Sequence, residues 1–176
     1  MDEKTLWYES VAFHGHECTG LTIGYKAALY AMELLNLTRA ADEEVVCVSE
    51  NDACGVDAIQ AILSCTIGKG NLLFHLTGKQ AFSFYERKSG KSVRLVLRPM
   101  PTGLSREASF ALHQSKAPQE LFEVKKAVIQ LPERARIFDS YICADCGERT
   151  GSQWMRLRGE DRVCRDCFKS YSRFDI

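Results

Sequence analysis

The chain has 176 residues, of which 45% are apolar, enough to fill the core of one medium domain and to leave a small appendage. Its formal net charge is zero, and no run approaches the roughly 20 apolar residues that span a bilayer, so composition argues against a membrane protein. The first residues lack the basic and then apolar pattern of a secretory signal, which predicts a cytoplasmic protein.

The eight cysteines bear on the kind of site to expect. Reducing compartments keep thiols free, so cysteine pairs at metal-ligand spacing are interpreted as ligands and not as disulfides. Charge is uneven, with residues 86–138 carrying 11 basic and 5 acidic side chains. These basic side chains could bind an anionic ligand or partner. Alternatively, they could complement the acidic first part of the chain, within the fold or across a dimer.

The first half predicts helices that begin beside reactive side chains. Residues 3–14 predict a short helix, and apolar residues at spacings of three and four predict a second over about 20–36. Between them lies the run Phe13-His14-Gly15-His16-Glu17-Cys18-Thr19-Gly20. Two imidazoles, a carboxylate and a thiol lie within five positions, which indicates metal binding or catalysis. A helix start also favours ionisation of the Cys18 thiol.

A second unusual stretch, residues 50–57, repeats this arrangement. Residues 45–49 predict a buried strand, and a helix follows from about Val56, with Asn51 or Asp52 as its N-cap. Cys54 therefore also lies beside a helix N-terminus, where it could share a pocket with His14, His16 and Cys18.

Three acidic residues near these stretches each have two interpretations. Glu17 and Glu50 are candidates for proton transfer, with solvated carboxylates as the alternative. Asp57, one turn into the second of these helices, could bond a histidine or could simply favour the positive end of the helix dipole.

The next segments predict an antiparallel sheet with one buried face. Strands are expected over 72–76, around Phe82 and Phe84, and around Val93 to Leu97, with a turn at 88–91. A helix is predicted over 105–116, and residues 122–130 favour a further strand, with an extension of this helix as the alternative. His75 is interpreted as a core residue and His113 as a helix-surface residue. The fold class is therefore α+β, with helices packed on the sheet over residues 1–138.

Residues 139–176 predict a separate small domain. Cys143 and Cys146 are followed, after seventeen residues, by Cys164 and Cys167, a spacing typical of a four-thiolate zinc ribbon. Iron at the four thiolates is an alternative. With 7 basic and 7 acidic side chains, this segment lacks the excess of positive charge that phosphate binding needs, so nucleic acid is disfavoured as a partner.

The chain resembles the formylmethanofuran dehydrogenase E-subunit-like family. The resemblance rests on residues 13–20 with Gly24, on Cys54 to Gln60, on Cys65 to Leu72, and on Ala135 to Phe138; the ribbon is similar to that of DksA/TraR-type proteins. The family pattern usually has Pro where Thr19 stands. The resemblance implies a dimer and a cleft lined by His14, His16, Cys18 and Cys54, which are the candidate catalytic residues.

The predicted metal ligands are the four ribbon cysteines for zinc, and His16, Cys18 and Cys54 for a second transition metal in the core. The sequence leaves three roles open: a metal-dependent or thiol-based enzyme, an accessory or regulatory protein that senses or delivers a metal, and a structural adaptor. A molybdenum or tungsten enzyme or a small molecule is the expected partner. The reaction is left open by these residues.

Overall fold

A computed structural model describes residues 2–171 and 173. The chain divides into two compact units, Met1–Ala135 and Arg136–Ile176. None of the described helices is both long enough and apolar enough to cross a membrane.

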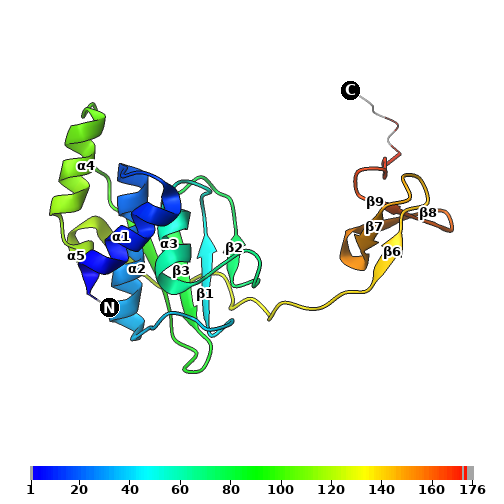
Figure 1. The fold of residues 1–176 in the computed structure, drawn as a ribbon, viewed down its shortest axis with the longest axis horizontal. Helices are drawn as coiled ribbons and strands as arrows, with labels where there is room; N and C mark the ends of the chain where they lie inside the picture. The colour runs from blue at the N-terminus through cyan, green and yellow to red at the C-terminus, as the bar shows by residue number, and fades with distance from the viewer. Residues whose placement is uncertain (1, 172, 174–176) are drawn as a thin grey trace. The chain divides into compact units, whose positions relative to one another are not determined.

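The first unit is a five-stranded sheet with helices packed on one face (Figure 1). The strand order is β2-β1-β3-β4-β5, antiparallel except for the edge strand β2, which runs parallel to β1. The predicted α+β class is confirmed. In chain order the elements are α1 (Glu3–His14), α2 (Thr19–Leu35), β1 (Val45–Ser49), α3 (Gly55–Leu63), β2 (Leu72–Phe74), β3 (Ala81–Glu86), β4 (Ser92–Leu97), α4 (Arg106–Ser115), α5 (Pro118–Leu121) and β5 (Phe122–Lys125).

The main core lies between the helices and one face of the sheet. Phe82 and Phe84 of β3 point into it and are fully buried. They meet the apolar side of α2, where Leu21 and Ala28 are also fully buried. The spacing of three and four along α2 therefore places its apolar residues on one side, as the sequence predicted.

The second face of the sheet is also covered, contrary to the expectation of one buried face. Val46, Val48 and Tyr85 form a smaller apolar cluster there, against which Ala127 and Ile129 pack. The covering residues, 126–135, run without regular structure, and we call them the strap. The predicted strand over 122–130 accordingly ends at Lys125, because the chain then leaves the sheet edge.

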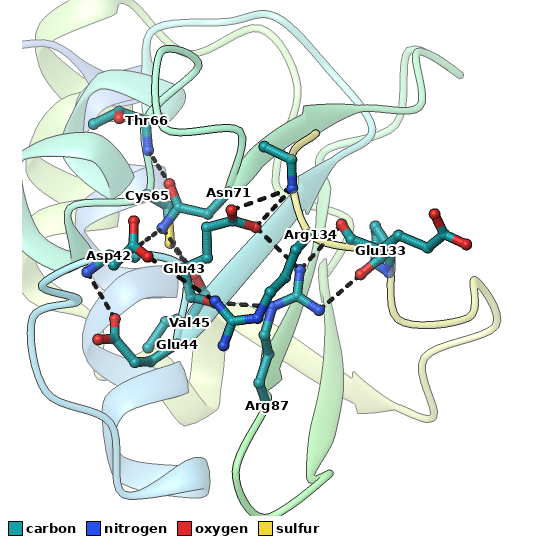
Figure 2. A network of polar contacts seen from close by, with 12 residues as sticks. Asp42, Glu43, Glu44, Val45, Cys65, Thr66, Asn71, Arg87, Glu133 and Arg134 are labelled. Atoms are coloured by element: carbon teal, nitrogen blue, oxygen red, sulfur yellow. Dashed lines mark hydrogen bonds and ion pairs between the residues drawn. The ribbon is translucent and has the colours of Figure 1, made fainter. Parts of the chain in front are cut away.

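Polar contacts hold the strap in place. The Tyr85 hydroxyl donates to the Ile129 carbonyl at 2.7 Å. The Arg87 guanidinium donates to the carbonyl oxygens of Pro132 at 2.8 Å and Glu133 at 3.2 Å (Figure 2). The Glu43 carboxylate accepts a bond from Arg87 and another from the Ala135 amide at 3.1 Å. Side chains thus satisfy four backbone groups of the strap, which does not pair with the sheet as a strand.

Asn71 ties together the loops beside this network. Its buried side-chain amide donates to the carbonyl oxygens of Asp42 and Val45, and its side-chain oxygen accepts from the Thr66 amide (Figure 2). The same amide group also donates to the Ser64 carbonyl oxygen. The 66–71 stretch is therefore a turn built around this one side chain.

The second unit contains two small hairpins. Strands β6 (Ser140–Ile142) and β7 (Arg149–Gly151) pair, the 3-10 helix η1 spans Ser152–Trp154, and β8 (Met155–Arg158) pairs with β9 (Asp161–Cys164). Among its described residues only Cys143 and Val163 are buried, so apolar packing contributes little. A core this small is typical of units that rely on disulfides or bound metal for stability.

Candidate functional site

The end of α1 and the start of α2 present three candidate residues on one short turn. The α1 C-cap, Gly15, has φ of 95°, a left-handed conformation that glycine adopts without strain and that reverses the chain after His14. Cys18 is the N-cap of α2, and its Sγ accepts a bond from the Leu21 amide at 3.3 Å. His14, His16 and Cys18 therefore lie close together although they belong to different elements.

His14 is oriented by a carboxylate from a third helix. Its Nδ1 lies 2.7 Å from Oδ2 of Asp57, in the first turn of α3. Its other nitrogen, Nε2, lies 3.7 Å from the Cys18 Sγ. A carboxylate on one ring nitrogen leaves the other as a lone-pair donor, which is the arrangement common to metal-bound histidines.

The three side chains are close enough to hold one ion. The ring centroids of His14 and His16 lie 4.6 Å apart. One ligand atom each from His14, His16 and Cys18 lies within 4.8 Å of the others. Imidazole nitrogen together with thiolate sulfur suits zinc and neighbouring transition metals.

Glycines explain why α2 and α3 bring their N-termini together. A Cβ added at Gly24 would lie 1.9 Å from the Gly55 carbonyl oxygen, and one added at Gly55 would lie 2.9 Å from that of Gly20. Backbone therefore packs on backbone between these helices. The contact carries Cys54, which precedes Gly55, to the region of Cys18.

Cys54 lies near Cys18 but is not part of the cluster of His14, His16 and Cys18. An added Cβ at Gly20 would lie 3.5 Å from the Cys54 Sγ. Burial raises the pKa of the Cys54 thiol, and the neighbouring Cys18 raises it further. The helix start therefore does not activate this thiol. The N-cap of α3 is Cys54 itself, not Asn51 or Asp52, although its side chain makes no capping bond.

A pocket of about 630 Å³ opens beside these groups. It is lined by His16, Glu17, Cys18, Thr19, Gly20, Cys54, Arg106, Glu107 and Phe110. Glu17 is held by the Trp7 indole, whose Nε1 donates to the Glu17 carboxylate at 3.1 Å. The pocket lining therefore combines two thiols, an imidazole and the Glu17 carboxylate with three residues of α4.

Asp57 had two open interpretations, and the α4 residues that line the pocket were not predicted. Of the two interpretations of Asp57, the structure supports the histidine partner. Arg106, Glu107 and Phe110 lie 90 or more residues after the histidines, and only the packing of α4 brings them near. No motif or spacing in the chain signals this contact.

Other candidate residues lie elsewhere. Glu50 is paired with Arg94, whose Nε and Nη2 donate at 2.5 and 3.0 Å. His75 is exposed and His113 is 4% exposed, so both interpretations of these histidines are wrong. His75 is exposed because β2 ends one residue before it, and His113 is buried because of how α4 packs. The residues next to each histidine in the sequence do not indicate either outcome. Cys47 and Cys65 are fully buried core residues.

The second unit holds the four remaining cysteines in one cluster. Ligand atoms of Cys143, Cys146, Cys164 and Cys167 lie within 4.8 Å of one another. The Cys143 Sγ accepts a bond from the Cys164 amide at 3.2 Å, and backbone amides lower the pKa of Cys143 to about 6. Arg158 binds Asp145, between the first two cysteines, with bonds of 2.6 and 2.7 Å. The cluster is thus arranged to bind a metal ion.

Comparison with known proteins decides the family. The FmdE family, described as "FmdE, Molybdenum formylmethanofuran dehydrogenase operon", matches residues 13–138. The chain belongs to the FmdE family. The match includes the histidine and cysteine cluster, Cys54, Asp57 and the strap, and it ends before Cys143. The core site is therefore part of the FmdE region, whereas the four-cysteine cluster follows it.

The chain is similar to one protein in sequence and to another in structure. It is 27% identical over 191 residues to a "Probable S-adenosyl-L-methionine-binding protein" of Archaeoglobus fulgidus, covering 90% of this chain and 51% of that protein. The chain thus spans about half the length of this relative. A crystal structure of a tungsten formylmethanofuran dehydrogenase FmdE-like protein from Syntrophus aciditrophicus matches with a TM-score of 0.72 and 24% identity, covering 95% of this chain and 92% of the other. This likeness supports the fold.

Proposed function

We infer that this FmdE protein binds metal, which the family and the four-cysteine cluster together support. We propose that the core also binds a transition-metal ion, through His14 Nε2, His16 and Cys18, and that this site acts on a small molecule in the adjoining pocket. The contact between His14 Nδ1 and Asp57 carries the proposal, because it directs Nε2 to the cysteine sulfur.

Three protein ligands from cysteine and histidine are the usual set of a catalytic zinc site, in which a further position stays open to water or substrate. A bound ion would supply Lewis acidity and would make a bound water easier to deprotonate. In this pocket Asp57 would hold the His14 ring in place, and Glu17 would accept a proton from a pocket-bound group. Cys54 lines the same pocket, where its thiol would offer a weak hydrogen bond to a bound molecule.

A second candidate is an accessory role, in which the protein delivers or senses a metal for a partner enzyme. The family description favours it, since it refers to the operon of a molybdenum formylmethanofuran dehydrogenase. A homodimer, zinc in the second unit and a molybdenum or tungsten enzyme as partner belong to this proposal. The two candidates share the core ion and differ in whether the pocket binds a small molecule.

The test is the metal content of the purified full chain, measured by elemental mass spectrometry. Wild type should carry about two ions per chain, one at each cluster. The Cys18→Ser variant and a Cys146→Ser, Cys167→Ser double variant should each lose about one. His75→Ala, which removes an exposed histidine outside both clusters, is the matched control. Equal metal content in wild type and Cys18→Ser would refute a core site.

Ligand binding then separates the two candidates. Thermal shifts of the metal-loaded protein with small organic acids and with S-adenosyl-L-methionine, which the A. fulgidus relative is named for, would reveal a substrate-binding pocket. Shifts that are lost in Cys18→Ser favour the enzyme. No shift with any compound, together with metal transfer to a partner, favours the accessory role.

A further inference from the structure

Three residues of α4, Arg106, Glu107 and Phe110, line the pocket together with the candidate metal ligands. Ser105 caps α4, and its Oγ accepts a bond from the Ala108 amide at 3.1 Å. Arg106 and Glu107 are therefore fixed in the first turn, with Phe110 one turn further along. The Phe110 ring lies 6.3 Å from that of Trp7, so this wall is packed against α1.

The two acidic groups of the pocket already have partners. The Trp7 indole donates to Glu17. The neighbouring backbone amide of Glu107 itself and the Ser105 side chain lower the pKa of the Glu107 carboxylate. Arg106 differs, since within residues 2–171 and 173 no carboxylate forms an ion pair with it.

Helix stability does not account for Arg106. It is the first residue of α4, where the positive end of the helix dipole disfavours a cation. An anion placed there would be favoured by the dipole and by the guanidinium together. We therefore propose that Arg106 binds the carboxylate of the pocket's ligand, and that this ligand is a small monocarboxylic acid with an apolar portion lying against Phe110.

Pocket charge and shape favour this class over phosphates. Glu17 and Glu107 lie on the same pocket, and their charge would repel a dianion more than a monoanion. The planar fork of a guanidinium matches a carboxylate with two parallel bonds. Phe110 offers an apolar surface beside it, and about 630 Å³ leaves room for a ring-sized substituent.

The inference rests on the proposed function, because it names the ligand class of the same pocket, but it is tested separately. Benzoate is the probe, and its neutral counterpart benzamide is the matched ligand. Calorimetric titration of the full chain, with and without added Zn²⁺, measures both affinities for wild type, Arg106→Gln, Arg106→Lys and Glu107→Gln. The last variant keeps Arg106 and alters its neighbour on the same turn.

Benzoate should bind wild type more tightly than benzamide, and Arg106→Gln should weaken benzoate by about tenfold or more while leaving benzamide unchanged. Arg106→Lys should recover part of the loss, and Glu107→Gln should not weaken benzoate. The inference is overturned if wild type binds no benzoate, if Arg106→Gln binds it equally well, or if inorganic phosphate binds more tightly. If elemental analysis finds no core metal in wild type but benzoate binding still depends on Arg106, the metal site is refuted and the carboxylate site stands.

Discussion

Nδ1 of His14 lies 2.7 Å from Oδ2 of Asp57, which joins the end of α1 to the first turn of α3. Asp57 also accepts a weaker bond from the Gln60 amide at 3.3 Å. The carboxylate is thus held from one side and holds the imidazole on the other. The orientation of the candidate metal ligand depends on this pair.

Asp57→Asn should weaken metal binding at the core by about 10 to 100-fold, because an amide holds the His14 ring less firmly and does not raise its basicity. Competition with a chelator of known affinity measures the change. Asp52→Asn, at an exposed position just before α3, is the control and should leave affinity unchanged. Equal affinity of Asp57→Asn and wild type would show that Asp57 does not support a ligand.

Gly24→Ala should destabilise the first unit by about 3 kcal/mol, because its Cβ would overlap the Gly55 carbonyl and force α2 and α3 apart. Urea unfolding followed by helical circular dichroism gives the free energy of unfolding. Gly68→Ala is the matched control, since an added Cβ there meets nothing within 4 Å. A Gly24→Ala protein as stable as wild type would mean that the helices are not packed this closely.

Glu50→Gln should lower stability at neutral pH by about 3 kcal/mol, because it leaves the partly buried Arg94 guanidinium without the buried carboxylate that pairs with it. The pKa of Glu50 is lowered from 4.5, chiefly by the bonds from Arg94, so the folded state takes up its proton less readily than the unfolded chain. The stabilisation is therefore complete above pH 4.5 and is lost as the pH falls through the lowered pKa.

The stability of wild type minus that of Glu50→Gln should accordingly shrink in acid, as measured by urea unfolding at a series of pH values. Glu123→Gln, on the exposed edge strand β5, should show no such dependence. A difference that is independent of pH would exclude the Glu50–Arg94 pair as its source.

Chelation of the metal should unfold the second unit and leave the first folded. Its hairpins bury little besides Cys143 and Val163, so the cysteine cluster supplies most of its folding energy. Hydrogen exchange followed by mass spectrometry should show amides over 140–164 becoming fast while those of α2 stay protected. Protection of residues 140–164 in the metal-free protein would contradict this dependence.

Local patterns are enough to predict most elements but few of their contacts. The apolar spacing of α2 and the alternation of β3 and β4 are properties of neighbouring residues, and the predicted helices and hairpin are present. The strap has no such pattern, and nothing near Val46 or Tyr85 in sequence indicates what covers them. The prediction for His113 is wrong for the same reason, because its burial comes from tertiary packing.

For the site, the dense run from His14 to Cys18 is sufficient to indicate three candidate residues. The close contact between α2 and α3 depends on Gly24 and Gly55. The sequence alone does not show that these two glycines meet. Arg106 gives no signal, since an arginine at a helix start is an ordinary surface residue until the fold places a pocket beside it.

The strap also bears on where this protein can be divided. A fragment ending at Lys125 would keep every strand of the large sheet but would expose Val46, Val48 and Tyr85 as an apolar surface open to aggregation. A fragment ending at Ala135 would retain its own cover and the Glu43 contact that fastens it. The cover of this face of the sheet is thus complete at Ala135, where the first unit ends.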